Sequence, residues 1–427
     1  KKITKEEYEE ALNTELKIIG KKEDSNYISI NYFRDSVLEE LKTITEVPAS
    51  TIETGGLKIY TTLDATAQKS LEDSVYSYIN DDTKIETAAI MMDPNTGEVL
   101  ALIGGNNYSK SQFNRATKAK RQVGSTMKPL LYYSALESGF TSSSSFTSEK
   151  TTFTFSGGKS YSPKNYNDRY AEGPLSMEAA IAYSDNIYAV KTHLFLGENN
   201  LINTAKRLGI TSNLSEVPSL ALGTSEISLI EMTSAYSCFA SLGYKTTPHF
   251  IKKIEDSKGN ILYENKEEKE LLLNPSLTYI LNEMLTSTYN KNFINYNYPT
   301  LISLLPQITH KYAIKSGTTD TDLLIMGYNK NVVLGVWNGY DNNTKIDSSE
   351  YSHHKNIWID TMESYFKQKE ASWYEIPNNV VGVLTEPITG ALATDETQNK
   401  EMFFYLKGTE PSAESNYKDL EAVFQEE

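Results

Sequence analysis

A serine followed three residues later by a lysine is the first candidate for catalysis. Ser125 and Lys128 stand in the segment Gly-Ser-Thr-Met-Lys-Pro, just before an apolar helical pattern at 129–133. If a helix begins at Ser125, both side chains lie on one face and the amine can reach the hydroxyl. A hydroxyl becomes a nucleophile when a base takes its proton, and a lysine can be that base where burial keeps it neutral.

This motif alone is weak evidence. Ser-x-x-Lys occurs five times, beginning at Ser125, Ser156, Ser352, Ser364 and Ser415, and only the Ser125 copy leads into a long apolar helix pattern. Taken by itself, the motif favours a serine that caps a helix and a solvated lysine.

Two later triplets strengthen the catalytic interpretation. Ser184-Asp185-Asn186 lies between two helical patterns, where a turn exposes its side chains, although it could simply cap the helix that follows. Lys315-Ser316-Gly317 ends a strand pattern, and its glycine permits close approach of another backbone. The alternative for this triplet is an edge strand with a protective charge.

In their order, the three motifs resemble the signature of penicillin-binding proteins and class A β-lactamases. The flanking sequence is similar to the transpeptidase region of class A penicillin-binding proteins. The similar segments are 55–64, 121–129, 163–166, 173–175, 219–226 and 235–236. The resemblance covers about residues 50 to 410. Val123 in place of proline, Ser316 in place of threonine and the lack of aromatic residues before Gly327 depart from the family pattern.

The resemblance implies a catalytic role for each of five residues. Ser125 would be the acylated nucleophile and Lys128 its base. Ser184 would relay a proton to the leaving amine, and Asn186 would hold the peptide group of the substrate. Lys315 would supply positive potential near Ser184. Together they imply a D,D-transpeptidase that cross-links peptidoglycan through a serine acyl-enzyme.

The same resemblance implies a substrate-binding strand at Ser316, Gly317 and Thr318. The two hydroxyls would bind the carboxylate of a D-Ala-D-Ala stem peptide or of a β-lactam. The backbone N–H groups of Ser125 and Thr318 would form the oxyanion hole. No cofactor and no metal is implied.

The elements that must position these motifs predict an α+β fold. A hairpin at 86–103 and three strands at 312–316, 323–328 and 332–337 give a five-stranded antiparallel sheet. Apolar helical patterns fill 176–240 and 277–285. The resemblance adds helices on both faces of the sheet and a helical cluster.

Three parts of the chain are expected. Residues 1–50 would be the end of a glycosyltransferase domain and a linker, and Gly55-Gly56 breaks the chain after them. Residues 51–376 would be the transpeptidase domain, and 377–427 a small β-like extension with strands at 380–384 and 402–406.

Composition limits the possible partners and compartment. Lys plus Arg number 41 and Asp plus Glu 56, so the net charge of −15 disfavours nucleic-acid binding. No apolar run is long enough to cross a bilayer, and the chain begins with Lys1-Lys2. We therefore expect a fragment of a membrane-anchored protein at the extracytoplasmic face. Its expected partners are stem peptides, β-lactams and cell-wall synthesis proteins.

Three other functions compete with this interpretation. A Ser-His-Asp hydrolase lacks its Gly-x-Ser-x-Gly elbow here, and His353-His354 is more typical of a solvated helix start than of a metal site. A β-lactamase would need a deacylating glutamate, for which Glu270 in Glu-Leu-Leu-Leu-Asn is a candidate in a surface-turn context. A non-catalytic β-lactam sensor or scaffold is the third.

Overall fold

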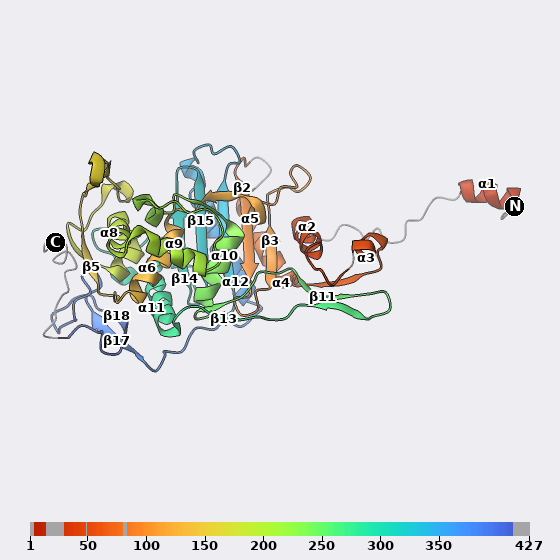
Figure 1. Ribbon diagram of the computed structural model, residues 1–427. Helices are drawn as coiled ribbons and strands as arrows, with labels where there is room; N and C mark the ends of the chain where they lie inside the picture. The colour runs from red at the N-terminus through yellow and green to blue at the C-terminus, as the bar shows by residue number, and fades with distance from the viewer. Residues whose placement is uncertain (1–3, 14–29, 48, 80–82, 413–427) are drawn as a thin grey trace.

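Five antiparallel strands form the central sheet of this computed structural model, which describes residues 4–13, 30–47, 49–79 and 83–412 (Figure 1). The strand order is β14-β15-β16-β2-β3, with bounds Ala313–Thr318, Asp322–Tyr328, Val333–Gly339, Glu86–Met92 and Val99–Ile103. The predicted hairpin and the three late strands are therefore confirmed. β14, which carries Lys315-Ser316-Gly317, is an edge strand of this sheet. Its outer side is therefore open to pairing with another segment or to a cleft.

Both faces of the sheet are buried. Along β15, Leu324 and Met326 pack into one hydrophobic core, whereas Leu323 and Ile325 pack into the other. This alternation follows from the period of two in a strand. Burial on both sides explains why the sequences of β15 and β16 are almost continuously apolar.

Helices cover both faces, which confirms the predicted α+β class. On one face α4 and α12 contact each other and the sheet, and on the other α10 lies against β16 and β2. The helices are α1 (Lys5–Asn13), α2 (Ile30–Leu41), α3 (Ala49–Thr54), α4 (Ala65–Tyr78), α5 (Arg115–Lys118), α6 (Lys128–Glu137), α7 (Met177–Tyr183), α8 (Asn186–Leu196), α9 (Glu198–Arg207), α10 (Leu229–Ala240), α11 (Pro275–Leu285) and α12 (His353–Phe366). Among the described residues, no helix combines the length and apolarity needed to cross a bilayer.

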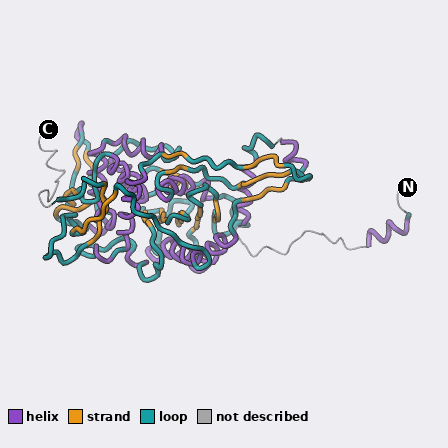
Figure 2. The backbone as a smooth tube through the Cα atoms, turned by 90° about the horizontal axis from the view of Figure 1, so that it is seen from below, coloured by secondary structure: helices purple, strands orange, loops and turns teal. Residues whose placement is uncertain are grey.

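A second sheet lies at the end of the body opposite the C-terminal hairpin (Figure 2). Its order is β1-β11-β12, with bounds Lys58–Thr61, Ile251–Glu255 and Ile261–Glu264. Nearby, α2 buries Tyr32 and Phe33, and Tyr32 Oη donates to the backbone oxygen of Ser111 at 2.6 Å. A helix from the first 50 residues thus packs on the described body of the chain.

The predicted C-terminal strands are confirmed as β17 (Val380–Thr385) and β18 (Glu401–Leu406). Phe403 and Tyr405 are buried, and the hydroxyls of Ser142 and Ser176 donate to Phe404 and Pro387 backbone oxygens. The hairpin therefore packs on the helical cluster.

Short strands of two to four residues complete the fold. They are β4 (Lys120–Gln122), β5 (Ser145–Ser148), β6 (Phe153–Thr154), β7 (Ser160–Tyr161), β8 (Gly173–Ser176), β9 (Glu226–Ser228), β10 (Tyr244–Lys245) and β13 (Glu270–Leu271). β5 lies in a stretch rich in serine, threonine and glycine, residues 141–160. Ser415 and its Ser-x-x-Lys copy lie outside the described residues.

Candidate active site

Ser125 lies in a 3₁₀ turn, η1 (Gly124–Met127), that leads directly into α6. The expected α-helix start at Ser125 is therefore wrong by three residues, since α6 begins at Lys128. Lys128 is fully buried, whereas Ser125 is half-buried. Tyr236 of α10 fixes this turn, because its hydroxyl donates to the Thr126 backbone oxygen at 2.7 Å.

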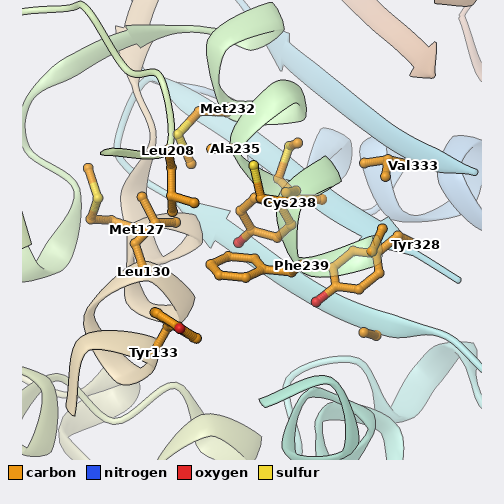
Figure 3. Close-up of a cluster of buried hydrophobic side chains, with 14 of the residues drawn as sticks. Met127, Leu130, Tyr133, Leu208, Met232, Ala235, Cys238, Phe239, Tyr328 and Val333 are labelled. Atoms are coloured by element: carbon orange, nitrogen blue, oxygen red, sulfur yellow. The ribbon is translucent and has the colours of Figure 1, made fainter. Parts of the chain in front are cut away.

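Apolar packing holds α6 against α10 and the sheet. Figure 3 shows this cluster, which includes Leu130 of α6, Cys238 of α10 and Tyr328 of β15. All three side chains are completely buried. The serine turn therefore rests on a rigid core, and its position is set by packing.

Three glycines bring the serine turn into backbone contact with two other segments. A Cβ on Gly317 of β14 would lie closer than 3.0 Å to the Val123 backbone oxygen. A Cβ on Gly223, which follows η4 (Pro218–Leu222), would lie closer than 3.0 Å to three backbone atoms of Gly124. Gly124 itself has φ +56°, and a Cβ there would lie 3.1 Å from Thr318 N. The close approach of the three segments requires glycine at these positions.

Replacing Gly223 by alanine should lower the free energy of unfolding by about 3 kcal/mol, because the new methyl group adds a backbone clash to left-handed strain. Gly139→Ala is the matched control, since Gly139 has φ +93° but nothing within 4 Å of its Cβ position. We expect that control to lose about 1 kcal/mol. Denaturant unfolding measures both, and equal losses would contradict the close contact.

The second motif, Ser184-Asp185-Asn186, is held in a strained turn between α7 and α8. Ser184 adopts the left-handed conformation with φ 54° and ψ 45°. Asp185 is buried and caps α8 by accepting from the Tyr188 N–H at 2.8 Å. It also accepts from Ser148 Oγ at 2.5 Å and from Asn165 Nδ2 at 2.6 Å. Strain of this kind at a polar, well-supported residue is typical of functional sites.

Asn186 is oriented by the segment 163–166. Asn165 Oδ1 accepts from the Asn186 N–H at 2.7 Å, and Asn186 Nδ2 donates to the Lys164 backbone oxygen at 2.7 Å. These two bonds leave Asn186 Oδ1 facing Lys128. Asn165 had no predicted role, and its only signal in the sequence was its place in a segment similar to the family.

The structure brings Lys128 together with the second motif. Its Nζ donates to Asn186 Oδ1 at 2.7 Å, to the backbone oxygens of Ser184 and Asp185 at 2.7 and 3.1 Å, and to Ser184 Oγ at 3.3 Å. Among the hydrogen bonds of the described residues, none joins Ser125 Oγ to Lys128 Nζ. Catalytic hydrogen bonds often tighten only when substrate is bound.

Burial lowers the pKa of Lys128 to about 7, from 10.5, and the nearby negative charge of Asp185 opposes that shift. Burial also raises the pKa of Asp185, against the hydrogen bonds from Ser148 and the Tyr188 N–H. A lysine with a pKa near neutrality can exchange a proton during a reaction.

The third motif lies on the edge strand beside the serine turn. Lys315, Ser316 and Gly317 are buried, and Thr318 is exposed. Lys315 Nζ donates to the Ser316 backbone oxygen at 2.7 Å. Its pKa is well below the usual lysine range, first because of burial and then because of the charges of Lys128 and Lys355.

An ion pair that the sequence did not predict supports the end of this strand. Arg121 Nε donates to Asp322 Oδ1 at 2.5 Å, and Trp337 Nε1 donates to the same oxygen at 2.8 Å. The Arg121 guanidinium also lies 5.2 Å from the Trp337 ring centroid. The pair joins the segment before the serine turn to β15 and β16, so it fixes the serine turn relative to the sheet.

Three residues were considered for other functions, and the structure gives the location and burial of each. Glu270 is exposed on β13, where it pairs with Lys245 of β10. His353 begins α12, as expected for a helix start, but His354 is fully buried, so the expectation that both are solvated is wrong. The described residues contain no group of three or more acidic, histidine or cysteine side chains placed to hold a metal ion.

Comparison with known proteins identifies the family of the chain. Residues 87–346 match the family model described as the penicillin binding protein transpeptidase domain. Penicillin-binding protein 2D of Bacillus subtilis is 42% identical over 383 residues, which is 89% of this chain and 55% of that protein. The chain thus spans about half the length of the curated relatives it matches.

Two solved structures share the fold. Penicillin-binding protein 1A from Haemophilus influenzae has a TM-score of 0.80 at 22% identity, covering 96% of this chain and 80% of that one. PonA1 from Mycobacterium tuberculosis in complex with penicillin V has a TM-score of 0.69 at 22% identity, covering 86% and 98%. With the family model matching more than half of its residues, this chain belongs to the penicillin-binding protein transpeptidase family.

Proposed function

We propose that this chain is a D,D-transpeptidase that cross-links peptidoglycan stem peptides through an acyl-enzyme on Ser125. The observation that carries the proposal is the buried Lys128 amine. Its pKa is about 7, and it contacts Ser184 and Asn186 beside the turn that carries Ser125. Family membership supports an acyltransferase-type enzyme. Ser125 and Lys128 are the groups that the proposed acylation would use as nucleophile and base.

In the acylation step, Ser125 Oγ attacks the carbonyl carbon of the peptide bond between two D-alanines, and Lys128 in its neutral form takes the hydroxyl proton. The C–N bond then breaks, and the proton passes through Ser184 to the departing D-alanine amine. An ester between Ser125 and the penultimate D-alanine remains. The backbone N–H groups of Ser125 and Thr318 would stabilise the oxyanion, a feature worth about 3–4 kcal/mol per donor in other enzymes.

In the second step, the amine of another stem peptide attacks the ester. It gives up its proton toward Lys128, the new amide forms, and Ser125 recovers its hydroxyl. Before acylation, the hydroxyls of Ser316 and Thr318, next to the Lys315 amine, would hold the donor carboxylate, which departs with the terminal D-alanine, and Asn186 would hold the donor's peptide group. A β-lactam enters by the same first step, but its ring opening releases no separate leaving group. Its adduct would therefore persist.

The rate of acylation should rise with pH and level off above a midpoint near pH 7. Below that pH the Lys128 amine is protonated and cannot accept a proton, so the rate constant should fall about tenfold per pH unit. The lowered pKa of about 7 sets this window, because an ordinary lysine at 10.5 would move it more than three units higher. Stopped-flow acylation by a chromogenic β-lactam between pH 5 and 9 measures it. A midpoint above pH 9 would rule out Lys128 as the neutral base.

The test of the function has two parts. Labelling with a fluorescent penicillin and peptide mass mapping should place one adduct on Ser125. A cross-linking assay with lipid-linked substrate should then yield dimeric stem peptides that penicillin prevents. Labelling without cross-linking would favour a β-lactam sensor, and rapid loss of the label by hydrolysis would favour a β-lactamase.

We also propose how the chain sits in a longer protein. Residues 1–50 would be the end of a glycosyltransferase domain and its linker, 51–376 the transpeptidase domain, and 377–427 a C-terminal extension. The whole protein would be anchored in the cytoplasmic membrane and act at its outer face, with cell-wall synthesis proteins as partners. The match covers only 55% and 46% of two curated relatives, which supports a longer parent protein.

A further inference from the structure

A third lysine, Lys355, lies close enough to Lys315 for its charge to act on that amine. Lys355 occupies the first turn of α12 and is half-buried, in one of the Ser-x-x-Lys copies that the proposed function does not use. Its Nζ donates to the Thr300 backbone oxygen at 3.3 Å, which is long for a charged donor. No carboxylate of the described residues forms an ion pair with Lys355.

The path of α12 brings Lys355 to the edge strand. Along the helix, the Phe366 ring centroid lies 6.2 Å and that of Trp358 5.3 Å from the Tyr312 ring, just before β14 begins. Trp358 also covers Gly327, where a Cβ would lie closer than 3.0 Å to its indole. Gly327 pairs with Ile314 of β14, so Trp358 lies level with Ile314, and Lys355, one turn earlier in α12, lies near Lys315, on which its charge acts.

Backbone contacts connect Lys355 to the other wall of the site. Thr300, which accepts from Lys355, donates its own N–H to the Ala182 backbone oxygen at 2.9 Å. Ala182 lies in α7, two residues before Ser184. The Tyr183 hydroxyl in turn donates to the Phe293 backbone oxygen, which holds the same 293–300 segment. Lys355 thus lies between the Lys-Ser-Gly strand and the turn of Ser184.

The charges around Lys355 do not balance. Burial lowers its pKa, and the charge of Lys355 contributes to the low pKa of Lys315. Its helix neighbours His353 and His354 both have pKa values below the usual range, first because of burial, so at neutral pH they carry no charge. Asp185 is the carboxylate whose charge acts on Lys128. Lys315 and Lys355 are neighbouring amines that form no ion pair within the described residues, so an anion close to them would stabilise their charged forms.

We propose that Lys355 is a specificity-determining residue that favours donors with a free carboxylate, by adding positive potential at the Ser316–Thr318 end of the site. The inference rests on the proposed function, because the carboxylate is that of an acylating donor. Lys355 needs no contact with the donor, since the potential of a partly buried charge extends over several ångströms.

Acylation by benzylpenicillin and by its methyl ester, which lacks the negative charge, tests this proposal. The ratio of the two second-order rate constants should fall about tenfold in Lys355→Met, a change that corresponds to about 1.4 kcal/mol. Lys355→Arg should keep most of the ratio, because arginine retains the charge. Lys367→Met, at the exposed far end of the same helix, should leave both rate constants unchanged.

Tyr183→Phe tests whether a structural change alone, without a change of charge, alters the ratio of the two rate constants. It removes a hydrogen bond that holds the 293–300 segment but keeps every charge, so it should lower both rate constants by the same factor. A Lys355→Met protein whose two rate constants fall equally would overturn the proposal in favour of a purely structural lysine. If the wild-type protein reacts with neither compound, the proposed function fails instead, and the two failures are thereby distinguished.

Discussion

Replacing Ser125 by alanine is expected to abolish covalent labelling by penicillin completely while leaving the fold intact. The hydroxyl is half-buried and forms no hydrogen bond within the described residues, so its loss costs little folding free energy. The glycine contacts on either side of it involve backbone atoms and stay unchanged in the variant. Intact-mass measurement after incubation with benzylpenicillin should show one adduct in the wild type and none in Ser125→Ala.

Ser352→Ala is a matched control for that experiment. Ser352 belongs to another Ser-x-x-Lys copy, is exposed, and makes no side-chain capping bond at the start of α12. Its variant should be labelled at the wild-type rate, and thermal unfolding should give the same midpoint for all three proteins. An adduct that persists in Ser125→Ala, or that maps to another serine, would contradict the assignment of the nucleophile.

The central sheet could be predicted because its strands carry their own signals. β2 and β15 are apolar runs bounded by turn-forming residues, and burial on both faces gives them no competing helical period. By contrast β5, with the sequence Ser-Phe-Thr-Ser, has no such signal. It forms because β8 pairs with it and because its serines are buried in the helical cluster.

The local structure at the nucleophile could not be predicted from local sequence. An α-helix was expected from Ser125, but Gly124 at φ +56° is pressed between Gly223 and the Gly317–Thr318 backbone, and this leaves only a 3₁₀ turn. Those contacts join segments about 100 and 190 residues away in the chain, distances at which no sequence periodicity operates.

The three motifs themselves were found by resemblance, and their supports were not. Nothing in the order of the residues indicates that Asn165 would hold both Asp185 and Asn186, or that Arg121 would pair with Asp322. His354 was expected to be solvated because it begins a helix, yet its own side chain is fully buried, although Ser352 beside it is exposed. These contacts and this burial depend on which elements pack together in the fold, and the local sequence around each residue does not indicate that packing.

Lys128→Arg should lower the rate of acylation by about a thousandfold or more, within the range of 10² to 10⁴ that a positioned general base contributes. Arginine keeps the positive charge and several donors for the Ser184–Asn186 acceptors, but its guanidinium does not release a proton at any pH of interest. The variant therefore separates the proton-accepting role of Lys128 from its structural role. Rapid-quench acylation by benzylpenicillin measures the loss.

The control for this variant is Lys128→Met, which removes both the proton acceptor and the hydrogen bonds. Because Lys128 Nζ contacts three residues of the second motif, Lys128→Met should also unfold at a lower temperature than Lys128→Arg. If both variants lose acylation equally but differ in stability, the catalytic loss follows from the missing base and not from a distorted turn at Ser184. Acylation by Lys128→Arg at close to the wild-type rate would show instead that the buried amine only holds Ser184 and Asn186 in place, and that another group takes the proton from Ser125.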